Sequence, residues 1–202
     1  MKEKLENRAY LCEVRAEEEG YIITGRPIVY NSRTNIGPFD EIIAEGALNL
    51  TDLTDVRFLV NHDTSRIPLA RSRRNNGNST MQLFTDEQGL SIRVELDCEN
   101  NAEARSLWSA VKRGDITGMS FMFSVRDEEW EGLDTSHPLR RITAIRSVVE
   151  VSAVTFPAYD ATTIDARSDE VLEKARAALE SARAKPLESG LELLKEKIKI
   201  LY

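Results

Sequence analysis

The stretch TGMSFMF, residues 117–123, is the one around which the chain is organised. It follows a predicted helix that ends at Gly114 and opens an apolar strand, so Ser120 stands where a tight turn becomes regular structure. A serine in such a place can be held rigid and still face a cleft. A free serine is a weak nucleophile, so attack on a carbonyl needs a base within hydrogen-bond reach and a third group that orients the base.

The chain has two histidines, His62 and His137, so the choice of base is short. His62 directly follows the compact apolar strand 56–60, and loops at the ends of strands commonly carry catalytic groups. Taken alone, a histidine in such a turn is more often bonded to its neighbours. His137 lies in a polar loop before Pro138 and is the weaker candidate.

Glu150 is the most informative acid, because it interrupts an apolar run within the predicted strand 141–154. A buried carboxylate is costly unless it is paired, and a histidine in front of it would be such a partner. Equally, Glu150 can lie on the solvated face of an alternating strand, since Ser152 shares its parity. The spacing leaves both interpretations open. Ser152 is a further candidate nucleophile, but no adjacent turn presents it.

The remaining pattern predicts an antiparallel meander with one helix. Apolar β-formers predict a hairpin of 9–16 with 20–30, and a second hairpin of 81–85 with 90–96 around Gly89. Residues 101–113 carry their apolar side chains on one helical face, with Asn100 as the expected cap. The segment 127–138 is polar and is predicted to be irregular. We therefore expect an α+β domain over residues 1–167.

From Ser168 the composition changes to helix formers, which predicts a helical C-terminal tail over 168–202. Leucine and isoleucine at 187, 191, 194, 198 and 201 follow the spacing of an a/d seam, too short for a coiled coil. A helix packed on its own domain and a tail that binds a partner are equally compatible with this pattern.

Composition excludes several classes of function. The formal charge of −7 gives no basic patch for phosphates, so no nucleic acid is expected as a partner. No run approaches the length of a membrane span, and the N-terminus lacks the apolar core of a signal peptide. Cys12 and Cys98 fit buried free thiols, and neither a metal site nor a cofactor motif is present, so no cofactor is expected.

With these residues in view, the chain resembles the prohead proteases of tailed bacteriophages, capsid-maturation serine peptidases that share a fold with herpesvirus assemblin. The resemblance covers about residues 10–167. It is carried by four blocks in the family's order: VNHD at 60–63 with LAR at 69–71, DEQGL at 86–90, GDITGMSF at 114–121 and EVSAVTFPAY at 150–159.

The resemblance implies a Ser/His/acid triad of Ser120, His62 and Glu150. It thereby selects the paired interpretation of Glu150, which spacing alone leaves open. It also implies an antiparallel β-barrel-like core with flanking helices, as in assemblin. Because assemblin-like enzymes use arginines near the site, Arg71, Arg140 and Arg141 are candidate helpers.

The activity implied is that of a serine endopeptidase that cleaves extensions of the major capsid protein or scaffold protein, and itself, inside the assembling prohead in the host cytoplasm. A homo-oligomer is compatible with this role. A second interpretation is a non-catalytic assembly factor whose tail binds capsid or scaffold protein. An unrelated esterase or amidase would need a small-molecule pocket that the sequence does not indicate.

Overall fold

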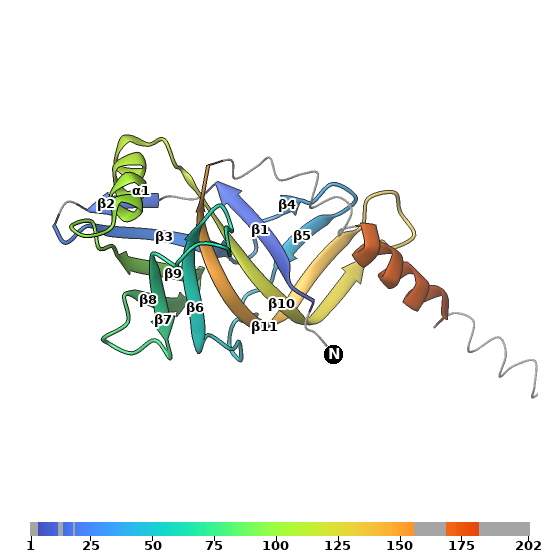
Figure 1. Cartoon of the computed structure of the whole chain (residues 1–202). Helices are drawn as coiled ribbons and strands as arrows, with labels where there is room; N and C mark the ends of the chain where they lie inside the picture. The colour runs from blue at the N-terminus through green and yellow to red at the C-terminus, as the bar shows by residue number, and fades with distance from the viewer. Residues whose placement is uncertain (1–3, 12–13, 18, 156–168, 182–202) are drawn as a thin grey trace, which may run out of the picture.

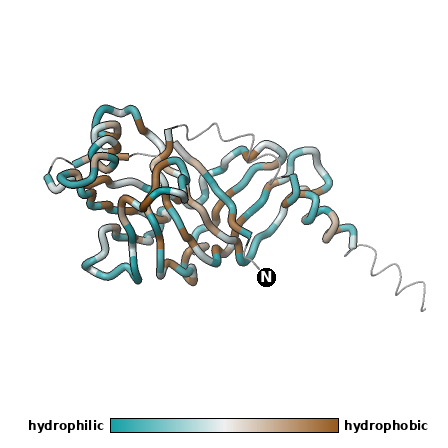
Figure 2. The backbone as a smooth tube through the Cα atoms, in the orientation of Figure 1, coloured by the Kyte–Doolittle hydropathy of each residue, from teal (hydrophilic) through white to brown (hydrophobic). Residues whose placement is uncertain are grey.

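The computed structural model describes residues 4–11, 14–17, 19–155 and 169–181. Figure 1 shows two β-sheets, with α1 over β2 and β3 at one end of the molecule and a second helix, residues 169–181, at the other end. The class is therefore mixed α+β, as predicted. The hydrophobic stretches lie on the strands of both sheets, and the connecting loops are mostly hydrophilic (Figure 2).

The first sheet is built on the long hairpin of β10 and β11, which pair antiparallel. β1 pairs antiparallel with the side of β10 that faces away from β11. On its other side, β11 pairs in parallel with two strands, with β5 through residues 139–142 and with β6 through residues 150–153. Register shifts between β10 and β11 allow this hairpin to curve. The strands of this sheet are β1 (Glu6–Leu11), β4 (Thr34–Asn35), β5 (Asp40–Ile43), β6 (Asp55–Val60), β7 (Ala70–Arg73), β10 (Gly118–Glu131) and β11 (Leu139–Val154).

The second sheet is antiparallel, in the order β2-β3-β9-β8. Gly89 sits at the turn between its last two strands with φ +135, and a Cβ there would lie 2.1 Å from the carbonyl oxygen of Ile28. Only glycine fits this close approach. The bounds are β2 (Val14–Glu17), β3 (Ile22–Val29), β8 (Met81–Asp86) and β9 (Gly89–Glu95).

Helix α1 (Ala102–Arg113) buries Ala104, Leu107 and Val111 in the core that both sheets share. The predicted stop at Gly114 is confirmed, with φ 78 in the left-handed region. The predicted cap is wrong by one residue. Asn101 is the N-cap, and its side chain accepts from the amides of Glu103 and Ala104 at 2.9 and 3.2 Å.

Three further expectations need correction. The predicted hairpin of 9–16 with 20–30 is split, because β2 pairs with β3 whereas β1 pairs with β10. The first sheet is mixed rather than antiparallel, since β11 accepts β5 and β6 in parallel. The expected barrel-like core is not confirmed, because within the described ranges the strands form two open sheets with separate strand orders.

The beginning of the predicted tail packs on its own domain. In the helix 169–181, Leu172 is buried against Ile36 and Phe39, with Trp130 and Leu133 alongside. Arg176 donates to the carbonyl oxygens of Leu133 and Thr135 at 3.3 and 3.1 Å. The apolar seam at 187–201, and with it the partner-binding interpretation, lies outside the described residues.

Candidate active site

Ser120 lies near the start of β10, between Ala9 of β1 and Ser152 of β11. Residues directly opposite each other in antiparallel strands share a face, so the side chains of Ser120 and Ser152 project from the same side of the sheet. That side is opposite to Phe121 and Phe123, which enter the core. Ser120 is 0% exposed, so a substrate carbonyl reaches its Oγ only after the residues around it move.

His62 is carried by a tight turn at the end of β6. Asn61 and His62 have φ values of 50 and 57, and the amide of Asp63 donates to the carbonyl of Val60 at 3.1 Å, the pattern of a type I′ turn. Asparagine and histidine tolerate this left-handed region better than most residues.

The turn is bonded to the end of β11. The amide of Asn61 donates to the carbonyl of Ala153 at 3.0 Å, and the amide of Thr155 donates to Asn61 Oδ1 at 2.9 Å. The amide of His62 donates to Ser152 Oγ at 2.9 Å. These bonds hold the imidazole of His62 over β10 and β11.

The structure brings the three predicted site residues together. His62 Nε2 lies 2.5 Å from Ser120 Oγ, and His62 Nδ1 lies 2.6 Å from Glu150 Oε2. The Glu150 side chain is 4% exposed and that of His62 is 11% exposed, so solvent weakens neither contact much. The second carboxylate oxygen of Glu150, Oε1, accepts a short hydrogen bond from Ser152 Oγ. Of the two interpretations of Glu150, the structure therefore agrees with the buried, paired carboxylate.

The arrangement admits two proton positions at Ser120, because a serine hydroxyl donates one hydrogen bond at a time. With His62 neutral and its Nδ1–H donated to Glu150, Nε2 accepts the proton of Ser120. The second acceptor is the carbonyl of Arg8, 2.8 Å from Ser120 Oγ. With His62 doubly protonated, Nε2–H donates to Ser120 Oγ and the serine donates to Arg8. His62 Nε2 and the carbonyl oxygen of Arg8 are therefore alternative acceptors for the Ser120 proton.

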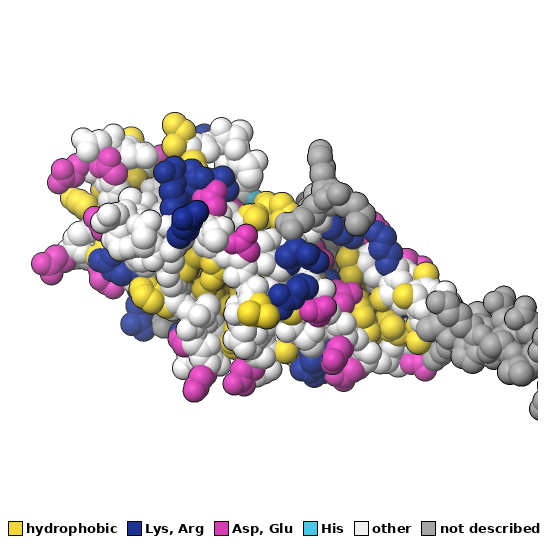
Figure 3. All heavy atoms as spheres, turned by 90° about the horizontal axis from the view of Figure 1, so that it is seen from below, with side chains coloured by type: hydrophobic (Ala, Val, Ile, Leu, Met, Phe, Trp, Pro, Cys, Tyr) yellow, Lys and Arg dark blue, Asp and Glu magenta, His cyan; other side chains and the backbone are white. Residues whose placement is uncertain are grey.

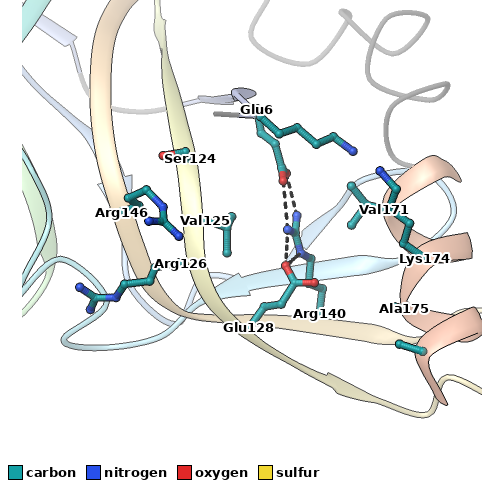
Figure 4. Close-up of a pocket in the computed structure, with 12 residues that line it drawn as sticks. Glu6, Ser124, Val125, Arg126, Glu128, Arg140, Arg146, Val171, Lys174 and Ala175 are labelled. Atoms are coloured by element: carbon teal, nitrogen blue, oxygen red, sulfur yellow. Dashed lines mark hydrogen bonds and ion pairs between the residues drawn. The ribbon is translucent and has the colours of Figure 1, made fainter. Parts of the chain in front are cut away.

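Arg8 is fixed by its place in a buried charge cluster of Glu6, Arg8, Glu41 and Arg140, and the more exposed Glu128 contacts Arg140 at the edge of this cluster. Glu41 accepts from Arg8 Nε and Nη2 at 2.6 and 2.8 Å and from Arg140 Nη1 at 2.9 Å. Burial opposes ionisation of Glu6, but hydrogen bonds and charges from Arg140 and Arg8 outweigh it and lower the pKa of Glu6 from 4.5 to about 2. Figure 4 shows Arg140 between Glu6 and Glu128.

The other candidates lie elsewhere. Arg71 pairs with Asp55, Arg140 belongs to the buried charge cluster and Arg141 pairs with Glu131, so the bonds of these arginines go to carboxylates outside the Ser120 site. His137 contacts Asp40 at 2.9 Å. The sequence interpretation missed the roles of Arg8 and Ser152. Only the long-range pairing of β1 with β10, and of β11 with β10 and β6, reveals these roles.

Two clefts are relevant to where a peptide could lie, and only the first adjoins the His62 turn. One of about 400 Å³ adjoins the His62 turn, between residues 59–69 and the start of α1, and its rim carries Ile67 at 86% exposed. Another, of about 830 Å³, lies between the β10–β11 hairpin and the helix 169–181, with Arg126 and Arg146 on the hairpin side and Lys174 on the helix side (Figure 4). The face in Figure 3 carries basic and acidic side chains interspersed.

The described ranges offer neither a metal site nor a membrane-spanning helix. No group of three or more His, Cys, Asp or Glu side chains is placed to hold a metal ion there. Among the helices of the same residues, none combines the length and apolar character that crossing a bilayer requires. Cys98 is buried as a free thiol, as expected, whereas Cys12 lies outside the described residues.

Comparison with known proteins gives three similarities. A family model described as caudovirus prohead serine protease matches residues 11–176. The prohead protease of Enterobacteria phage HK97 is 30% identical over 142 residues, which cover 69% of this chain and 56% of that protein. The chain thus spans about half the length of this relative. The solved bacteriophage T4 capsid assembly protease, gp21, matches with a TM-score of 0.40 and 10% identity, over 76% of this chain and 98% of that one.

Proposed function

The chain belongs to the caudovirus prohead serine protease family, whose model covers residues 11–176, and from this premise we propose that it is a serine endopeptidase of capsid maturation. The observation that carries the proposal is the continuous contact from Ser120 Oγ through His62 to Glu150, at 2.5 and 2.6 Å. Each member has the neighbour that an acyl-transfer triad requires.

In the proposed mechanism, His62 Nε2 takes the proton of Ser120 as Oγ attacks the scissile carbonyl. The tetrahedral intermediate collapses with loss of the amine, which receives that proton from His62, and leaves an acyl ester on Ser120. Water, deprotonated by His62, then hydrolyses the ester and frees the serine. Glu150 holds the Nδ1–H tautomer and stabilises the charged ring. Because Ser120 is 0% exposed, a local opening precedes attack.

The substrates proposed are extensions of the major capsid protein or the scaffold protein, and the chain itself, cleaved inside the assembling prohead in the host cytoplasm. Support comes from the family description and from the name of the HK97 relative, a prohead protease. Peptide termini of capsid or scaffold protein are flexible enough to enter a site that must first open.

The test is co-expression with the capsid and scaffold proteins of the same phage, followed by intact mass measurement. Wild-type chain is expected to give truncated products, and Ser120→Ala to give none, because loss of a triad serine costs on the order of 10⁶ in rate. Ser124→Ala is the matched control, a buried serine of the same strand bonded to Ser147 at 2.8 Å. Unchanged processing by Ser120→Ala would overturn the assignment, and absence of processing by wild type would favour the non-catalytic assembly factor.

A further inference from the structure

We propose that Ser152 is a positioning residue of this site, whose hydroxyl fixes both the acid and the base. The proposal rests on the proposed function, because it concerns the same serine, histidine and glutamate. It assigns a role to a buried side chain that is neither the nucleophile nor a member of the triad.

Ser152 occupies the centre of the arrangement. On β11 it lies opposite Ser120 of β10 on one side and beside Leu59 of β6 on the other, and it is 0% exposed. Its Oγ accepts from the backbone amide of His62 at 2.9 Å and donates to Glu150 Oε1. One hydroxyl therefore connects the strand of the acid to the turn of the base.

The proton count explains why this serine is not itself the nucleophile. A serine hydroxyl has one proton and two lone pairs. In Ser152 the proton is given to Glu150, and one lone pair is taken by the amide of His62. Ser120, by contrast, has an imidazole nitrogen within 2.5 Å to accept its proton. Two serines on the same face of the sheet therefore have different tasks.

The hydroxyl of Ser152 restrains both Glu150 and the turn that carries His62. Glu150 has its two oxygens occupied by different donors, His62 Nδ1 and Ser152 Oγ, which fixes the plane of the carboxylate. The His62 amide is held in a left-handed turn that few residues adopt readily. Without Ser152 Oγ, this amide would lose its acceptor and Glu150 Oε1 its donor, so the turn and the carboxylate would both relax.

The decisive variants are Ser152→Thr and Ser152→Val, which have the same shape and differ by a hydroxyl against a methyl group. Any crowding in the buried site is common to both, so their difference isolates the hydroxyl. Ser152→Ala adds no bulk and replaces Val if that variant does not fold. Ser147→Ala is the control for loss of a buried serine hydroxyl elsewhere on β11.

The first readout is processing of purified, uncleaved capsid protein. We expect Ser152→Val to lower the turnover rate roughly 10- to 100-fold relative to Ser152→Thr, with little change in the substrate concentration for half-maximal rate. Loss of the hydroxyl would misplace His62 and Glu150, and misplaced catalytic groups lower the turnover rate rather than the binding of substrate. Equal rates for the Thr and Val variants would overturn the proposal.

The second readout is independent of activity. The chain has two histidines, so ¹⁵N-histidine NMR resolves the imidazole of His62 from that of His137. At a pH well above the ordinary histidine range, wild type and Ser152→Thr should show His62 protonated at Nδ1, and Ser152→Val a mixture of tautomers. The same Nδ1–H tautomer in Ser152→Val would contradict the proposal.

The two hypotheses fail separately. If Ser120→Ala processes capsid protein like wild type, the proposed function is wrong and the NMR comparison alone judges Ser152. If Ser120→Ala is inactive while Ser152→Val matches Ser152→Thr in both readouts, the nucleophile stands and the positioning role of Ser152 is wrong.

Discussion

Replacement of Glu41 by glutamine should be one of the most destabilising single changes in this fold. Glu41 is 1% exposed and accepts three hydrogen bonds from the guanidinium groups of Arg8 and Arg140. Glutamine keeps the shape, but its carboxamide offers one acceptor oxygen and turns an NH₂ group toward two other donors. The cluster also fixes Arg8, whose carbonyl contacts Ser120.

The expected loss follows from these contacts. Three bonds between charged groups at about 1.5 kcal/mol each agree with the roughly 3–5 kcal/mol lost when one partner of a buried ion pair is removed. With an m-value of about 2 kcal/mol/M, the urea midpoint of Glu41→Gln should fall by roughly 2 M. Unfolding followed by circular dichroism measures it.

The control is Asp86→Asn, which breaks the surface pair of Asp86 with Arg26 and should leave the midpoint almost unchanged. The two substitutions make the same chemical change in different environments. A loss below about 1 kcal/mol for Glu41→Gln would refute the view that this cluster anchors β1.

Two other predictions concern stability. The pKa of Glu6 is lowered from 4.5 to about 2, so its contribution to stability is complete above pH 4.5 and is lost as the pH falls through 2. Glu6→Gln should therefore remove about 3 kcal/mol of the acid dependence of the unfolding free energy, measured by urea unfolding at a series of pH values. Asn101→Ala should cost about 1 kcal/mol through loss of the α1 cap, whereas Asn100→Ala should cost clearly less, and equal losses would contradict the assignment of the cap.

The sequence predicted correctly those elements whose bounds depend on neighbouring residues alone. The helix before Gly114, the strand before His62 and the hairpin at Gly89 all follow from periodicity, caps and glycine. The polar run 127–131 was predicted to be irregular, yet β10 continues through it. Cross-strand pairs of Glu128 with Arg140 and Glu131 with Arg141 join this run to β11, and such partners are invisible in a local window.

The candidate site was predictable in part for a different reason. Scarcity of histidine left few candidates for the base, and the turn after β6 places His62 where a strand end was expected. Spacing could not choose between two environments for Glu150, because its neighbour across the sheet, Arg57 of β6, is paired in parallel from 93 residues away. The link through Ser152 depends on that same pairing.

The most direct test of the central claim is covalent labelling with a fluorophosphonate, followed by peptide mass spectrometry. In this reaction Ser120 Oγ bonds to phosphorus, fluoride leaves and His62 takes the proton. The predicted result is a single adduct on the peptide containing Ser120, absent from Ser120→Ala and strongly reduced in His62→Ala. An adduct on Ser152, or equal labelling of wild type and Ser120→Ala, would contradict the assignment of Ser120 as the nucleophile.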